Sequence, residues 1–309
     1  MNPIICLAGP TASGKTALAV ELAKELDGEV VSCDSMQVYR RMDIGTAKPT
    51  EAEMQGIPHH MIDVASPEED YSVSRYCAQA APIVEDIVAR GKTAIIAGGT
   101  GLYMDSLIRG NDFAPFPSTG VREQLEAEAD RAGMEALLQR LREIDPEAAE
   151  RLHLSDRKRI IRALEVYLET GETITAHNRR TQSVPPRFSP IWLGLDFEQR
   201  AELYSRIDRR VMLEMGLVAE IQGLLSSGIP EKCTAMQAIG YKEFTAALEG
   251  AGTIVEAADQ VRLSSRHYAK RQLTWFRRNK QMHWLLRKPG EGSEEILRQA
   301  RQVLQENDT

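Results

Sequence analysis

The chain has 309 residues, 42% of them hydrophobic, which is enough to bury the core of one large domain and a smaller one. No segment approaches the roughly 18 consecutive apolar residues of a membrane span, and the N-terminal apolar run is too short for a signal peptide. The four cysteines form no C-x-x-C pair, which argues against a zinc site and against a disulfide framework. We therefore expect a soluble, cytoplasmic protein with no membrane association.

The net charge of −7 is unevenly distributed along the chain. Residues 262–288 carry nine Lys or Arg and no acidic residue, whereas residues 121–150 carry nine acidic residues against four basic ones. Aromatic residues are interleaved with the basic ones in residues 262–288, a composition typical of a surface that binds phosphates and stacks on unpaired bases. A helix with a buried aromatic face and a solvated charged face explains the same aromatics equally well. The acidic net charge therefore does not exclude a nucleic acid as partner.

The first predicted element is a strand over residues 4–8, which leads directly into GPTASGKT at residues 9–16. This segment matches G-x-x-x-x-G-K-[ST], a loop that surrounds phosphates with backbone N–H groups. Gly9 and Gly14 allow backbone angles that a side chain would forbid, so N–H groups can turn toward an anion where the next helix, over residues 17–26, begins. Lys15 adds a positive charge, and the Thr16 hydroxyl is placed to bind Mg²⁺ that bridges two phosphates. The predicted diphosphate site consists of Gly9, Pro10, Thr11, Ala12, Ser13, Gly14, Lys15 and Thr16, with Mg²⁺ as cofactor.

Short apolar runs alternate with helical patterns over the first 110 residues. Strands are expected over residues 29–33 and 92–98, with a helix over residues 76–91 between them. This alternation predicts an α/β fold with a parallel, twisted sheet that is covered by helices.

Proline and glycine mark the limits of a second segment, at residues 111–120 and 178–190. Between them the pattern is almost wholly helical from residue 121 to about residue 170, and Asp145 with Pro146 predicts a turn between two helices. A further strand is expected over residues 191–197. We therefore predict a helical insertion domain over residues 112–187, within a catalytic core formed by residues 1–111 and 188–309.

Helical patterns return after residue 200 and continue through the basic residues 262–288. Arg206 and Arg210 are four residues apart and share one helical face, so their guanidinium groups are spaced to clamp a diphosphate. The same spacing also fits two surface arginines balanced by Asp208 and Glu214.

Asp34 directly follows the strand over residues 29–33, whereas the strand over residues 92–98 leads into GGTG with no acid. Side chains after the ends of parallel strands face the ligand crevice, so Asp34 is expected near the diphosphate and able to act on a second substrate. A magnesium ligand or a helix N-cap are the alternatives for this residue. Ser35, Gln37, Tyr39 and Arg40 follow it and are suited to reading the hydrogen-bonding edges of a base.

Eight motifs then occur in order along nearly the whole chain: GPTASGKT, DSMQVYRRMDIGTAKP, PHHMIDV, GGTGLY, RALEVY, RID-R-R, MQAIGYKE and YAKRQLTWFR. In these motifs the chain resembles the tRNA dimethylallyltransferases, also called tRNA isopentenyltransferases. It resembles their bacterial form, because no C-x2-C and H-x-H zinc module follows the basic residues. The resemblance implies a P-loop NTPase-like sheet that binds dimethylallyl diphosphate. It also implies transfer of the dimethylallyl group to N6 of the adenosine 3′ of the anticodon, position 37, in tRNAs that read codons beginning with U.

The implied reaction assigns roles to three residues. The adenine amine is a poor nucleophile because its lone pair is delocalised, so a carboxylate must take its proton, and Asp34 is the candidate. Thr16 and Arg210 are expected to contact the diphosphate near its bridging oxygen, with Arg206 as a weaker companion.

The resemblance also implies a set of residues that bind the tRNA anticodon stem-loop. The target base must leave the stacked loop to reach a carboxylate, so its neighbours need partners. The expected partners are Asp34, Ser35, Met36, Gln37, Thr100, Arg122, Lys158, Arg159, Ile160, Ile161, Arg162, Gln237, Ala238, Ile239, Gly240, Tyr241 and Lys242. We expect His59 and His60 to be structural, because no cysteine or carboxylate-rich partner suggests a metal.

Three other functions share parts of this pattern. A nucleoside or nucleotide kinase has the same fold, an RNA-binding protein with a regulatory nucleotide site has no transfer chemistry, and an adenylate isopentenyltransferase acts on free nucleotides. The helical insertion and the basic residues 262–288 favour a macromolecular acceptor. We expect the protein to act as a monomer.

Overall fold

The computed structural model describes residues 4–111, 119–213 and 216–307. The chain divides into two compact units, one formed by residues 1–110 with 187–309 and the other by residues 111–186. These bounds lie one residue from those expected from the sequence. We call them the core unit and the insertion unit.

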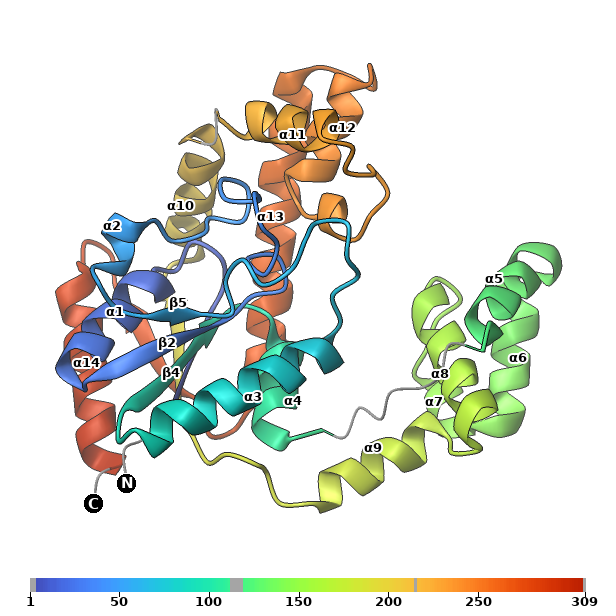
Figure 1. Cartoon of the computed structure of the whole chain (residues 1–309), viewed down its shortest axis with the longest axis horizontal. Helices are drawn as coiled ribbons and strands as arrows, with labels where there is room; N and C mark the ends of the chain where they lie inside the picture. Colours follow the sequence, from blue (N-terminus) through green and yellow to red (C-terminus); the bar gives the residue numbers. More distant parts are fainter. Residues whose placement is uncertain (1–3, 112–118, 214–215, 308–309) are drawn as a thin grey trace. The chain divides into compact units, whose positions relative to one another are not determined.

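The core unit contains a parallel six-stranded sheet in the order β3-β2-β4-β1-β5-β6 (Figure 1). The predicted α/β class with a parallel sheet is confirmed. The strands are β1 (Ile4–Ala8), β2 (Gly28–Cys33), β3 (His59–His60), β4 (Thr93–Gly98), β5 (Ile191–Phe197) and β6 (His283–Arg287).

Helices cover both faces of this sheet, which explains why its central strands are apolar throughout. In β1, Ile5 and Leu7 pack in one cluster with residues of α1 (Lys15–Glu25) and α14 (Ser293–Asn307). Cys6 and Ala8, which point the other way, pack in a second cluster with residues of α3 (Val73–Ala89) and α4 (Gly101–Arg109). The loops at the carboxyl ends of the strands are thereby left to form a site.

The other core helices are α2 (Glu51–Met54), α10 (Arg200–Leu213), α11 (Leu217–Ser226), the 3-10 turn η1 (Ala235–Gln237), α12 (Tyr241–Leu248) and α13 (Ile254–Phe276). The helix expected through the basic residues ends at Phe276, and β6 occupies residues 283–287 instead. Leu285 and Arg287 of β6 are buried while Leu286 between them is exposed, the alternation of a strand with one covered face. No helix in the described ranges is long and apolar enough to cross a membrane.

The insertion unit is all helical. It consists of α5 (Val121–Ala132), α6 (Met134–Ile144), α7 (Pro146–Glu150), α8 (Arg157–Thr170) and α9 (Ile174–Ser183). Leu125, Leu137, Ile160 and Leu164 belong to a hydrophobic core of this unit alone. Asp145 lies between α6 and α7, as the turn expected there requires.

Asp145 holds the insertion unit together through two buried hydrogen bonds. Its Oδ1 accepts from the backbone N–H of Ala148 (3.1 Å) and its Oδ2 from that of Thr175 (3.0 Å), and the residue is 4% exposed.

We expect Asp145→Ala to lower the free energy of unfolding by about 2 kcal/mol or more, because two buried donors lose their acceptors. Denaturant unfolding of the full chain measures the loss. Asp145→Asn keeps one acceptor and is expected to lose about half as much. Unchanged hydrogen exchange at the Ala148 and Thr175 amides in the Ala variant would contradict this role.

Candidate active site

A cavity of about 940 Å³ lies where the carboxyl ends of β1, β2 and β4 meet α10 and α13 in the core unit. One part of its wall is the phosphate-binding loop, and another is the segment that follows β2. It brings together most of the residues expected to act on the donor and on the base. These are Thr11, Ala12, Ser13, Gly14, Lys15, Thr16, Asp34, Ser35, Met36, Gln37, Arg206, Arg210, Gln237, Ala238, Ile239 and Lys242.

The phosphate-binding loop leaves the start of α1 without a side-chain cap. Gly14 takes the N-cap position with φ 94°, and no side chain accepts from the first N–H groups of the helix. The Ser13 hydroxyl is buried and has no hydrogen-bond partner among the described residues. Uncapped N–H groups at a helix N-terminus are the usual binding site for a phosphate.

Two arginines of α10 reach this loop from the same helical face. Arg206 Nε donates to the Ala12 carbonyl (2.9 Å), and Arg210 Nη1 donates to the Thr11 hydroxyl (2.9 Å). Arg210 Nη2 also donates to the Gly45 carbonyl (3.2 Å). Both guanidinium groups therefore lie at the cavity wall, where a diphosphate in the loop would meet them.

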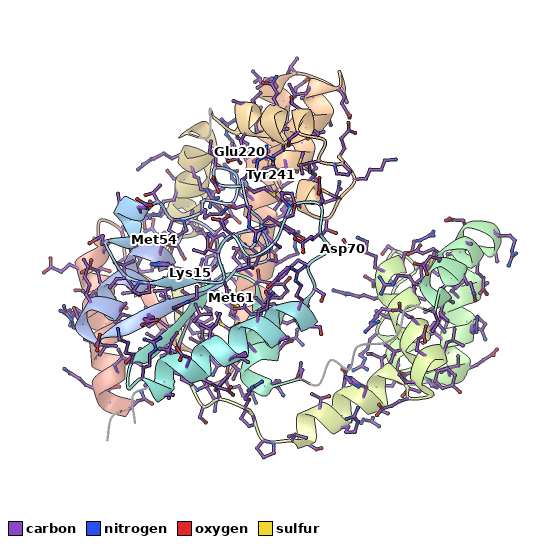
Figure 2. All side chains as sticks on the ribbon, in the orientation of Figure 1. Lys15, Met54, Met61, Asp70, Glu220 and Tyr241 are labelled. Carbon is purple, nitrogen blue, oxygen red and sulfur yellow. The ribbon has the colours of Figure 1, made fainter. Side chains whose placement is uncertain are left out.

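Lys15 lies in the same loop (Figure 2), and its Nζ donates to the carbonyls of Gly9 (3.0 Å) and Pro10 (2.8 Å). Burial lowers the pKa of Lys15 to about 8; the negative charge of Asp34 opposes this shift and Arg210 adds to it. The ammonium group is therefore charged at neutral pH but loses its proton at mildly alkaline pH.

The two carboxylate oxygens of Asp34 have different surroundings. Oδ1 accepts from the backbone N–H groups of Met36 (2.8 Å) and Gln37 (3.3 Å), so it caps the turn after β2; no helix begins there, which contradicts the helix N-cap alternative. Oδ2 has no hydrogen-bond partner among the described residues. One oxygen thus fixes the orientation of the side chain while the other is able to accept a proton.

The Thr100 hydroxyl supports the chain at Asp34. It accepts from the backbone N–H of Ser35 (3.0 Å), while the backbone N–H of Thr100 donates to the Cys33 carbonyl (3.2 Å). Thr100 does not line the cavity itself. In the structure it therefore positions the end of β2.

Comparison with known proteins places this geometry in a family. The family model described as IPP transferase matches residues 37–279. The chain belongs to the IPP transferase family. It is 43% identical over 307 residues to a tRNA dimethylallyltransferase of Acetivibrio thermocellus, covering 98% of each chain.

Solved structures of the family have the same fold. A crystal structure of the full-length tRNA isopentenylpyrophosphate transferase from Bacillus halodurans is 40% identical, with a TM-score of 0.73, and the match covers 100% of this chain and 98% of that one. A eukaryotic dimethylallyltransferase acting on tRNA is 26% identical, with a TM-score of 0.80, over 99% of this chain and 80% of that one. The P-loop-like sheet expected from the sequence is thereby confirmed.

Several residues that were expected to contact RNA have side chains that are buried or hydrogen-bonded within the protein. Tyr39 and Tyr241 are fully buried, and the Tyr241 hydroxyl donates to Glu220 (2.5 Å), beside which it lies in Figure 2. The Gln37 side chain lines the cavity, but its amide donates to the Thr46 and Ala47 carbonyls. The prediction that Tyr39 reads a base is therefore wrong, whereas the contact of residues 237–242 with RNA stays a prediction.

The residues of the insertion unit that were expected to contact RNA are partly buried and partly exposed. Ile160 and Ile161 are buried in its hydrophobic core, so their side chains cannot meet RNA, contrary to the prediction. Lys158 and Arg159 are exposed. Arg122 is exposed and pairs with Glu165 (2.8 Å). The basic side chains of residues 158–162, and not the whole range, remain candidates.

The remaining expected residues lie around the cavity or away from it. Gly9 and Pro10 are the buried first residues of the phosphate-binding loop, and Gly240 is the buried N-cap of α12. His59 and His60 form the edge strand β3 and pair with Val30 and Val31.

Sequence reasoning missed Gln272 of α13, which joins two parts of the site. Its Oε1 accepts from the Thr11 N–H (2.9 Å) and its Nε2 donates to the Gly99 carbonyl (2.9 Å), with the residue 5% exposed. A Cβ at position 99 would lie 2.1 Å from Gln272 Nε2, so a side chain there would displace the Gln272 amide. Gln272 therefore ties the phosphate-binding loop to the end of β4.

Tyr268 of α13, one of the aromatic residues expected in the basic stretch 262–288 either to stack on bases or to be buried, lines the same cavity. Burial raises the pKa of its hydroxyl, and the charge of Asp34 contributes to the shift. The spacing of these residues in the sequence was a signal for both. Four residues at helical spacing, 3 or 4 positions apart, line the cavity: Val261, Ser265, Tyr268 and Gln272.

The lowered pKa of Lys15 predicts how anion binding depends on pH. We expect the affinity for inorganic diphosphate, measured by calorimetry, to fall as the pH rises through about 8, because neutral Lys15 no longer attracts the anion. Lys15→Met should weaken binding at pH 7 by roughly tenfold or more. Lys15→Arg, which stays charged, is the control for titration of diphosphate itself. The same pH slope in the wild type and the Arg variant would contradict the assignment.

Proposed function

We propose that this protein transfers a dimethylallyl group from dimethylallyl diphosphate to N6 of adenosine 37 in tRNAs that read codons beginning with U, giving N6-isopentenyladenosine and diphosphate. One observation carries the proposal: a single cavity holds both an uncapped phosphate-binding loop and a carboxylate with one unengaged oxygen, in a chain of the IPP transferase family. The named relatives are tRNA dimethylallyltransferases, which supports tRNA as the acceptor.

The donor half of the reaction is electrostatic. When the allylic C–O bond breaks, its electron pair leaves with the diphosphate, so negative charge grows on the bridging oxygen. The N–H groups at the start of α1, the Lys15 ammonium and the guanidinium groups of Arg206 and Arg210 lie where they stabilise that charge. Because the folded protein already holds these groups in place, they need little rearrangement when the C–O bond breaks.

The acceptor half requires a base. As N6 of adenine bonds to the allylic carbon, it becomes positively charged and must release a proton. Asp34 Oδ2 takes this proton, while the two backbone N–H groups on Oδ1 hold the carboxylate in place.

The residues of the loop also fit Mg²⁺. Thr16 lines the cavity, whereas the described residues contain no group of three or more His, Cys, Asp or Glu placed for a metal. A site with one protein hydroxyl suits Mg²⁺, which takes most of its ligands from phosphate oxygens and water. When bound, the ion supplies charge neutralisation for the diphosphate, and Thr16 would hold it.

Exposed basic and polar side chains support the proposed RNA partner. Gln237 and Lys242 are exposed near the cavity in the core unit, and α13 exposes Lys270 and Arg271. We propose that a monomer acts, and that it does so in the cytoplasm.

A transfer assay tests the proposed function against its alternatives. Purified protein is incubated with labelled dimethylallyl diphosphate, Mg²⁺ and an anticodon stem-loop with adenosine at position 37, in the presence of ATP and AMP. We expect label on the RNA and none on a matched stem-loop with guanosine at position 37, which lacks the N6 amine. Label on AMP would indicate a free-nucleotide transferase, and ATP cleavage with unlabelled RNA would indicate a kinase.

The role of Asp34 is tested by Asp34→Asn, which keeps an oxygen for the Met36 and Gln37 N–H groups but cannot take up the proton. We expect turnover to fall by about 10²–10⁴-fold, with stem-loop affinity changed by no more than a few-fold. Asp34→Ala, which also removes the cap, should lose at least as much. Near-normal turnover in the Asn variant would remove Asp34 from the mechanism.

A further inference from the structure

Arg287 is a buried arginine that the proposed chemistry does not use. It ends the edge strand β6 and is paired in register with Phe197 of β5, so it lies at the same carboxyl edge of the sheet as the phosphate-binding loop. Its residue exposure is 8%, although a charged side chain is seldom buried unless it is paired.

The hydrogen bonding of Arg287 is incomplete. Nη1 donates to the Glu291 carbonyl (3.1 Å), but Nε is buried and has no partner among the described residues. Glu202 and Glu291 are the carboxylates close enough to affect it, and neither forms an ion pair with it within the described ranges. Burial, followed by repulsion from Arg206, lowers the pKa of the Arg287 guanidinium.

Arg287 faces the phosphate-binding loop together with Arg206. Its Nη2 lies 3.7 Å, and Arg206 Nη2 lies 3.8 Å, from the point where a Cβ on Gly14 would sit. Both guanidinium groups also lie over the Phe197 ring, at 5.9 and 5.8 Å from its centroid. Two cations and the uncapped start of α1 thus converge on one point beside Gly14.

We propose that Arg287 and Arg206 form a subsite for the terminal phosphoryl group of a diphosphate whose other phosphoryl group occupies the loop. An anion there relieves the repulsion between the two cations and supplies an acceptor for the two Nη2 groups beside Gly14. The identity of the donor rests on the proposed function. The subsite itself would bind the terminal phosphoryl group of any diphosphate.

The subsite predicts a selective loss of affinity. In calorimetry with the full-length protein, we expect Arg287→Met to weaken binding of inorganic diphosphate by roughly tenfold or more. Binding of inorganic monophosphate, which needs only the loop, should change by less than about twofold. Arg298→Met is the matched control, because Arg298 is exposed on α14 and pairs with Glu295 of its own helix.

The outcomes separate this role from a structural one. Equal losses for both anions would show that Arg287 only shapes the loop, and no loss for diphosphate would show that it does not contact the anion; either result overturns the inference. If the Met variant does not fold, Arg287→Lys tests the same selectivity, because lysine lacks the planar, bidentate donors.

The measurement does not depend on transfer. If the wild type modifies RNA but the variant binds diphosphate normally, the subsite is wrong and the proposed function stands. If the selective loss occurs in a protein that modifies no RNA, the subsite stands and the proposed function fails.

Discussion

The site depends on a loop that must hold its shape while its own N–H groups stay uncapped. A helix start without a side-chain cap has donors that lack partners, and such a loop gains no rigidity from them. Rigidity is supplied from outside: Gln272 binds the Thr11 N–H, Arg206 binds the Ala12 carbonyl and Arg210 binds the Thr11 hydroxyl. Each of these contacts spans more than 190 positions in sequence, so the loop can bind an anion only in the folded core unit.

The same contacts explain how an acidic protein concentrates positive charge. Lys15, Arg206, Arg210 and Arg287 gather around the loop, and burial makes the charges of Lys15 and Arg287 costly. Elsewhere in the core unit, Arg200 and Arg277 have a close acidic partner in the buried Asp196. Positive charge therefore gathers beside the phosphate-binding loop, where an anionic substrate compensates it, and the net charge of −7 says little about the partner.

The sequence predicted those features that local patterns determine. Apolar runs bounded by glycine identified β1, β2, β4 and β5, and the glycine spacing identified the phosphate-binding loop. β6 was missed because its five residues continue a basic, helix-like stretch, and only pairing with β5 makes them a strand. Tyr39 was expected to read a base because the sequence does not show whether a polar side chain in a motif points outward or, as Tyr39 does, into the core. Gln272 was missed because its partners lie far away in sequence.

Asp34 shows how position and reactivity are combined in one side chain. A base that is held by no hydrogen bond samples several rotamers and loses precision, whereas one that is fully hydrogen-bonded has no lone pair to offer. The turn after β2 resolves this conflict by binding only Oδ1, and Thr100 fixes the turn through the Ser35 N–H. Thr100 in turn follows Gly99, whose carbonyl is held by Gln272. The carboxylate and the phosphate-binding loop are thus positioned by the same glutamine, so the distance between base and leaving group is set by packing of α13 and not by either loop alone.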